Sequence, residues 1–109
     1  MREKMLFLTF FELRTSLGYK KIAEVYSKFQ KMRDLDPHFG GLKIINMLVT
    51  PGGKGVTLVE TDKEENLERF YLEWEKTLPG IFEHYEIYPA VTFEKAVSLA
   101  LEEPTYLKA

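Results

Sequence analysis

The stretch that decides the fold is residues 55–78, which read GVTLVETDKEENLERFYLEWEKTL. Its first part, residues 56–61, has the composition of a β-strand, and a helix is expected from about Lys63 to Thr77. Asp62 is the expected N-cap of this helix, with Glu65 three residues later as in a capping box. The helix has one apolar stripe, which predicts that it covers a sheet. The stripe consists of Leu67, Phe70, Tyr71, Trp74 and Leu78.

Three further strands are expected around this unit, because they contain short runs rich in Phe, Leu, Ile and Val. A glycine-rich loop joins the second strand to the third, as in a β-hairpin. Pro89 is expected to end the fourth strand, since proline has no amide hydrogen to donate. The predicted strands besides residues 56–61 are residues 5–12, 42–50 and 82–88.

Two further helices are expected. Ser16 is the candidate N-cap of the first, which runs to about Met32. Its apolar stripe is expected to consist of Ile22, Ala23, Tyr26 and Phe29. Thr92 is the expected cap of a short C-terminal helix over about residues 92–103. The 109 residues are expected to form a single domain, with its core at about residues 5–91.

The element order is therefore β-α-β-β-α-β plus a C-terminal helix, which is the ferredoxin-like, split β-α-β pattern of the α+β class. Right-handed crossovers place the two long helices on one face of a four-stranded antiparallel sheet. The opposite, open face ought to be polar where it meets water. Strands one and two, however, have apolar residues on both of their faces.

The open face of this sheet therefore needs a cover. Four strands present roughly 400 Å² of projected face, which is at the limit for an exposed apolar patch on a monomer. The C-terminal helix, about 15 Å long, is expected to cover less than half of it. The sequence therefore predicts that the chain pairs with itself as a homodimer, open face against open face.

Three short motifs carry a resemblance to a known family. They are LVETD at residues 58–62, Trp74 in the helix that follows, and IYP at residues 87–89. With the order of elements, they resemble the dimeric α/β-barrel superfamily, and within it a small branch known only as a domain of unknown function. The resemblance covers roughly residues 5–91. It implies a homodimer with a barrel between its sheets and, in enzymatic relatives such as cofactor-free monooxygenases and haem-handling proteins, a ligand cavity inside it.

The candidate functional residues are polar side chains expected on the open face. The candidates for catalysis are His84, Glu60 and Glu86, and those for ligand binding are Asn46 and Tyr88. The placement on strand four requires Tyr85 and Ile87 to face the helices, and the side on which Asn46 lies is ambiguous. A histidine with two carboxylates in a partly dry cavity can transfer protons or hold a metal. Alternatively, strand four is a sheet edge whose polar residues are solvated.

The composition excludes several kinds of site. The chain has no cysteine, which excludes disulfides, Cys-ligated zinc, iron–sulfur clusters and thiol catalysis. A 2-His-1-carboxylate iron site would need His38, which is expected in a loop away from His84. Residues 52–55, GGKG, lack the Ser or Thr and the following helix of a phosphate-binding loop. No metal, haem or other cofactor is therefore expected.

The charge and hydropathy patterns narrow the partners. A net charge of −2 gives no reason to expect nucleic acid as a partner. No segment reaches the ~20 apolar residues of a membrane span, so no membrane partner is expected. A cytoplasmic location is expected instead. The sequence favours a non-enzymatic homodimeric module that binds a small apolar ligand or serves as an interaction unit. The alternative is a cofactor-independent barrel-type enzyme, monooxygenase-like, that uses His84 with Glu60 or Glu86.

Overall fold

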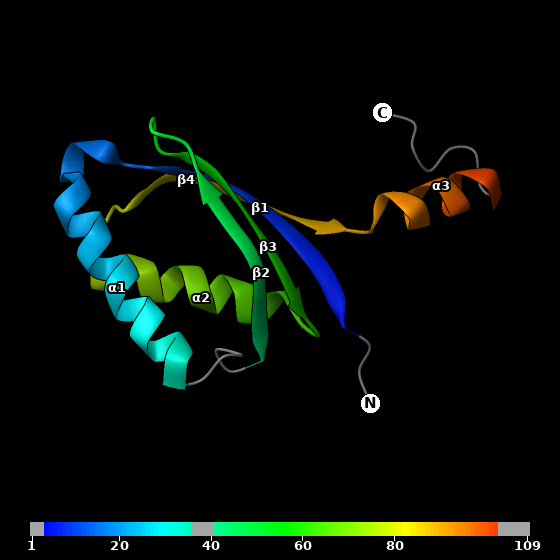
Figure 1. The fold of residues 1–109 in the computed structure, drawn as a ribbon, viewed down its shortest axis with the longest axis horizontal. Coiled ribbons are helices and arrows are strands. Elements are labelled where there is room, and N and C mark those ends of the chain that lie inside the picture. The colour runs from blue at the N-terminus through cyan, green and yellow to red at the C-terminus, as the bar shows by residue number, and fades with distance from the viewer. Residues whose placement is uncertain (1–3, 36–40, 103–109) are drawn as a thin grey trace.

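The computed structural model describes residues 4–35 and 41–102, and for residues 33–35 only the backbone. One four-stranded antiparallel sheet has two long helices on one face, and a third helix follows the last strand (Figure 1). The elements are β1 (Met5–Leu13), the 3-10 turn η1 (Thr15–Leu17), α1 (Tyr19–Leu35), β2 (Leu42–Val49), β3 (Lys54–Thr61), α2 (Glu64–Thr77), β4 (Phe82–Ala90) and α3 (Phe93–Glu102). This is the ferredoxin-like α+β fold that the sequence predicts.

The strand order is β2-β3-β1-β4, so β2 and β4 are the sheet edges. Leu8 in the middle of β1 lies opposite Leu58 of β3 and Tyr88 of β4, which fixes the register across three strands. The expectation that Pro89 ends the fourth strand is wrong, because β4 continues to Ala90 and Pro89 pairs with Phe7. An edge strand tolerates proline, since the amide on its outer side has no partner strand.

A β-bulge at Ile45 interrupts β2. Ile44 pairs with Val59 and Asn46 with Leu58, so Ile45 is an extra residue between two consecutive partners. As a result Ile44 and Met47 both face the helices, although they are three positions apart in the sequence. Asn46 therefore lies on the open face, on the side that the sequence alone left ambiguous.

The core lies between the sheet and the helices, and α2 dominates it. Its predicted stripe is confirmed: Leu67, Phe70, Tyr71 and Trp74 are buried, and Leu78 packs against the cluster. The Trp74 ring stacks on Phe29 of α1, with centroids 4.8 Å apart and an interplanar angle of 9°. This stack joins the two helices over the sheet.

The predicted caps are confirmed at one helix only. Thr92 accepts a hydrogen bond at its hydroxyl from the Lys95 amide, 3.1 Å, as expected of the cap of α3. Asp62 is not the N-cap of α2, which begins at Glu64 with Lys63 in the capping position and no side-chain cap bond. The preceding turn is held instead by Thr61, whose hydroxyl accepts from Asn66 Nδ2 at 2.9 Å and donates to a backbone carbonyl at 2.8 Å.

Helix α1 begins later than predicted. Ser16 lies in η1 and does not cap the helix, because Gly18, with φ of 96°, separates the turn from the first helical residue, Tyr19. The helix buries Ile22, Phe29 and, in addition to the prediction, Val25. Ala23 and Tyr26, which were expected in the core, are exposed, because the buried stripe follows positions 22, 25 and 29 and these two lie at its border.

Two local features join the strands and helices tightly. A Cβ atom on Gly55 would overlap the Phe11 ring and the Leu48 carbonyl, so only glycine fits at this point of β3. The carboxylate of Glu75 on α2 accepts hydrogen bonds from the amides of Gly80 and Phe82, at 3.0 and 3.2 Å. These bonds fix the turn that leads into β4.

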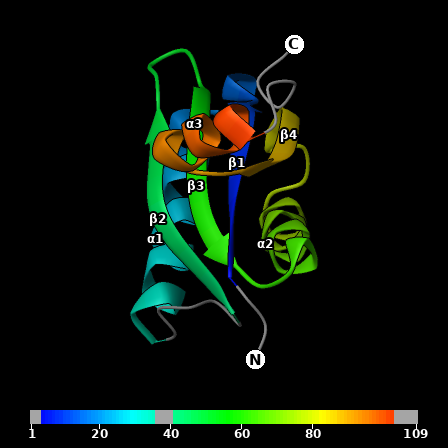
Figure 2. The ribbon, with the colours of Figure 1, turned by 90° about the vertical axis from the view of Figure 1, so that its right-hand side faces the viewer.

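Helix α3 does not pack on the open face. The chain measures 48 × 33 × 18 Å, and α3 and the α1–α2 pair lie at opposite ends of its long axis, with the sheet between them (Figures 1 and 2). Phe93 and Leu101 of α3 are 83% and 82% exposed. The partial cover expected from α3 is therefore absent, and none of the described residues covers the middle of the open face.

Candidate functional site

The open face of the sheet has an apolar centre between two charged ends. Its central residues are half-buried or exposed side chains from all four strands: Leu8, Phe10, Leu48, Val56, Leu58 and Tyr88. Phe10 is 48% exposed, and its ring meets that of Tyr88 edge to face, with centroids 6.1 Å apart. Charged residues lie beyond this centre, among them Glu60 at one end and His84 at the other.

Three of the five candidate residues form a hydrogen-bonded row along β4. Glu86 is central: one carboxylate oxygen lies 3.2 Å from His84 Nε2, and the other accepts from the Tyr88 hydroxyl at 2.9 Å. The bond from Tyr88, and then the one from His84, hold the pKa of Glu86 below its usual value. The same bond raises the pKa of Tyr88, since ionised Tyr88 would face a carboxylate. In the single chain this row is exposed to solvent.

Glu60 is not part of this row. It shares a cross-strand row with Leu6 and Ala90, and Ala90 lies six residues along β4 from His84. At about 3.3 Å per residue, this separation is roughly 20 Å. The candidate acid–base group therefore comprises His84 and Glu86, with Tyr88 beside them and Glu60 at the far end of the face.

Asn46 shares the face but not the row. It lies opposite Leu58, with two strands between it and β4, which carries Tyr88. Its side-chain oxygen accepts a hydrogen bond from the Met47 amide at 2.9 Å. The side-chain amide nitrogen is the group that Asn46 can offer to a ligand on this face.

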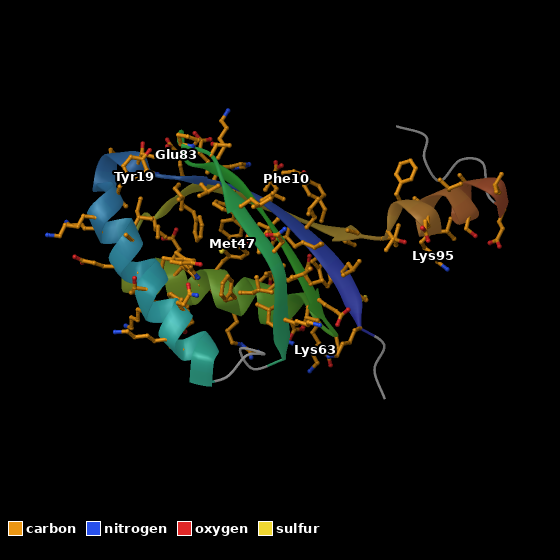
Figure 3. All side chains as sticks on the ribbon, in the orientation of Figure 1. Phe10, Tyr19, Met47, Lys63, Glu83 and Lys95 are labelled. Carbon is orange, nitrogen blue, oxygen red and sulfur yellow. The ribbon has the colours of Figure 1, made fainter. Side chains whose placement is uncertain are left out.

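A second candidate site lies on the other side of the sheet, between α1 and the end of β2. An apolar cavity of about 420 Å³ opens there. Met47, which is labelled in Figure 3, is one of the residues that line it. Its lining includes Phe11, Tyr26, Met47, Val49, Trp74 and Phe82. The volume is in the range of small-molecule sites, which are mostly apolar and aromatic. A flat apolar group is therefore the ligand that its walls suit.

The sequence contained a weak signal for this cavity. Tyr19 and Tyr26 are two turns apart on one side of α1, and Ala23 lies between them. Both tyrosines are exposed and line the cavity, and the Tyr19 hydroxyl donates to the Pro51 carbonyl. The apolar stripe predicted on α1 is wider than the part of the helix that is buried against the sheet, and the extra width, at Ala23 and Tyr26, lines the cavity.

A metal site has no support in the part of the chain that the structure describes. No cluster of three or more His, Asp or Glu residues that could hold an ion occurs there. His38 lies outside the described residues. Within the same residues, no helix is both long and apolar enough to cross a membrane.

Comparison with known proteins places the chain in a family. The model of the family described as a domain of unknown function, DUF3303, matches residues 5–103. The chain belongs to the DUF3303 family. The match covers the whole described sheet and α3, so α3 is part of the DUF3303 domain and not an appendage to it. No curated protein matches the chain.

Solved structures with the same fold extend the comparison. This DUF3303 chain is similar to an uncharacterised NIPSNAP-like domain protein from Burkholderia xenovorans, with TM-score 0.55 and 12% identity over 85% of this chain and 88% of that one. It is similar to Rv0793 from Mycobacterium tuberculosis, with TM-score 0.51 and 12% identity over 84% and 96% of the two chains. It is also similar to a hydroxynitrile lyase from Passiflora edulis, with TM-score 0.51 and 14% identity over 86% and 97%. At 12–14% identity these structures share the fold of this chain, which is the ferredoxin-like α+β fold that its sequence predicts.

Proposed function

We propose that this DUF3303 domain is a homodimeric module that binds a small apolar ligand. The observation that carries the proposal is the cavity of about 420 Å³ between α1 and β2, whose lining includes several aromatic side chains, Trp74 among them. An apolar ligand there would bury surface that the single chain leaves open, and each Å² of apolar area removed from water contributes about 25 cal/mol. The sequence predicts such a ligand between two facing sheets, whereas the cavity favours the helix side of the sheet.

The binding test uses Trp74, the only tryptophan of the chain, as an energy donor. The probe is N-phenyl-1-naphthylamine, a neutral apolar fluorophore. We expect saturable binding with energy transfer from Trp74. Ala23→Leu narrows the cavity and should weaken binding, whereas Ser27→Leu, one turn further along α1 and outside the cavity lining, should not. Equal binding by both variants would exclude this cavity as the site.

The homodimer is supported by the bare apolar centre of the open face. A sheet with Leu8 and Phe10 in its middle is stable in water when a second sheet packs on it at about 10 Å. We expect light scattering at micromolar concentration to give twice the chain mass of 12.8 kDa. Leu8→Lys should give monomers or aggregates, and circular dichroism on the same samples checks that the variant is folded. A mass of one chain over the whole range would refute the dimer.

A second candidate function is catalysis without a cofactor by the row on β4. The observation that favours it is the pair of hydrogen bonds on Glu86, which hold His84 and Tyr88 side by side on the face where two sheets would meet. His84 could then transfer a proton, with Glu86 orienting its ring. This function requires that the dimer shields the row from water.

Chemical modification separates the two candidates. Diethyl pyrocarbonate modifies accessible imidazoles, and peptide mass spectrometry locates the product at His84. Slow modification in the dimer and fast modification in Leu8→Lys would support an enclosed row. If His84 in the dimer reacts as fast as it does in the unfolded chain, it is a solvated edge residue and the catalytic function fails.

A further inference from the structure

The starting observation is that α3 carries an apolar stripe whose side chains are exposed. Phe93, Val97 and Leu101 lie four residues apart on one side of the helix, and they are 83%, 40% and 82% exposed. An isolated helix of 10 residues is marginal in water. The radius of gyration is 15.7 Å, against about 13 Å for a compact chain of this length. The helix is therefore held away from the body of its own chain.

The direction of α3 points to a second copy of the chain as its contact. The helix pair α1–α2 lies on one side of the sheet, and α3 extends from the end of β4 on the other side (Figures 1 and 2). A second sheet that covers the open face would lie about 10 Å above it. Helix α3 is about 15 Å long. If it lies at the height of that second sheet, it would extend past the second sheet's edge.

A second apolar surface without a cover lies at the diagonally opposite corner of the sheet. It consists of the part of edge strand β2 from Ile45 to its end, where Ile45, Leu48 and Val49 are 46%, 57% and 56% exposed. Leu48 shares a row with Phe10, whereas α3 follows Ala90, which shares a row with Leu6. An exposed apolar edge strand is a surface that a folded protein covers or pairs.

A two-fold axis can bring these two corners together. In one such arrangement the strands of the two facing sheets cross at near right angles, and the two-fold axis runs along one diagonal of the sheet. Each of the two corners on the other diagonal then lies over the opposite corner of the partner's sheet. The α3 of one copy then lies at the β2 edge of the other, and the reverse contact forms at the same time. If the strands were instead aligned, α3 would meet the first half of β2, whose open-face residue is the charged Lys43.

We propose that α3 is an exchanged arm, whose stripe packs on Ile45, Leu48 and Val49 of a second copy in a dimer with crossed sheets. The areas are consistent with this arrangement. The sheet face contributes about 500 Å², which alone is short of the ~800 Å² per partner of a stable interface. One face of α3 and the surface that receives the partner's α3 each add about 150 Å².

The arm also connects the dimer to the proposed function, on which this inference rests. Leu48 and Val49 line the apolar cavity between α1 and β2. The partner's α3, packed on these residues, would border the mouth of the cavity and shield a bound ligand from water. Ligand binding would then depend on the dimer, because the wall on the open side belongs to the second copy.

Cross-linking tests the contact directly, because the natural chain has no cysteine. Chains with Leu48→Cys and chains with Val97→Cys are mixed, allowed to exchange subunits, and treated with a short bismaleimide. We expect a covalent dimer that contains one chain of each kind, identified by mass. The matched control replaces Leu48→Cys by Lys43→Cys and should give little product. Product with Lys43→Cys but not with Leu48→Cys would overturn the crossed arrangement.

Affinity gives the second measurement. Leu101→Gln should weaken the dimer about tenfold or more in sedimentation analysis, whereas Glu102→Gln, on the other side of α3, should leave it within about twofold. Both residues are exposed in the single chain, so neither variant should unfold it. If Leu8→Lys breaks the dimer while Leu101→Gln does not, the sheet-face dimer stands and the exchanged arm is refuted. If the natural chain is a monomer throughout, both are refuted.

Discussion

Replacing Trp74 by alanine should remove much of the stability of this domain. The side chain is only 3% exposed, stacks on Phe29 at 4.8 Å and meets Phe70 and Phe82 at centroid distances of 6.1 and 6.0 Å. A buried tryptophan removes about 150–250 Å² from water, which at about 25 cal/mol per Å² corresponds to about 4–6 kcal/mol. Alanine retains a small part of this, so we expect a loss of about 3–5 kcal/mol.

The assay is urea unfolding followed by circular dichroism, at one fixed chain concentration because a dimer makes the midpoint depend on concentration. A domain of this size has a total stability of about 5–15 kcal/mol, so a loss of about 3–5 kcal/mol should lower the midpoint by about a fifth or more. Leu72→Ala is the matched control on the exposed side of α2, where Leu72 is 53% exposed, and it should cost less than about 1 kcal/mol. Similar midpoints for Trp74→Ala and the natural chain would refute the assignment of Trp74 to the core.

Three further predictions concern other contacts. Gly55→Ala should lower the urea midpoint strongly because the new methyl group has no space in β3, while Gly52→Ala, in the open hairpin loop, should change it little; equal effects would contradict the close approach of the strands. Glu75→Ala leaves two backbone amides without their acceptor and should cost about 1–3 kcal/mol, whereas an unchanged midpoint would mean that water replaces the carboxylate. Glu86→Gln should lower the pKa of Tyr88 toward its usual value in an NMR titration, and an unchanged pKa would show that the hydrogen bond is absent in solution. Because the pKa of Glu86 is lowered in the folded chain, its bonds stabilise the fold above the usual carboxyl pKa, and this contribution should be lost as the pH falls through the lowered value.

Periodicity in the sequence was sufficient to predict the fold and the buried face of α2. Leu67, Phe70, Tyr71 and Trp74 recur with the helical period and are all buried, because that face has a whole sheet beneath it. The strand end predicted at Pro89 is wrong, because that prediction assumes that strand pairing needs the amide hydrogen that proline lacks. At a sheet edge it is not needed.

The candidate site was predictable only along a single strand. His84, Glu86 and Tyr88 alternate on β4, and alternation places them on one face whatever the rest of the chain does. Glu60 reaches the same face from β3, but its distance from His84 depends on the register through β1, which no local pattern contains. The cavity beside Tyr26 depends on how far α1 stands from the sheet, and this follows from tertiary packing.

The bulge in β2 has a consequence for how this strand tolerates insertions and deletions. Ile45 is the extra residue between Ile44 and Asn46, which already pair with consecutive residues of β3. Removing Ile45 would therefore leave every other side chain of the strand on its present face, whereas removing Met47 would reverse the faces of its neighbours. The length of β2 can thus vary by one residue at this position without moving its core-facing side chains to the open face. Related chains that differ in length here should align with their gap at Ile45.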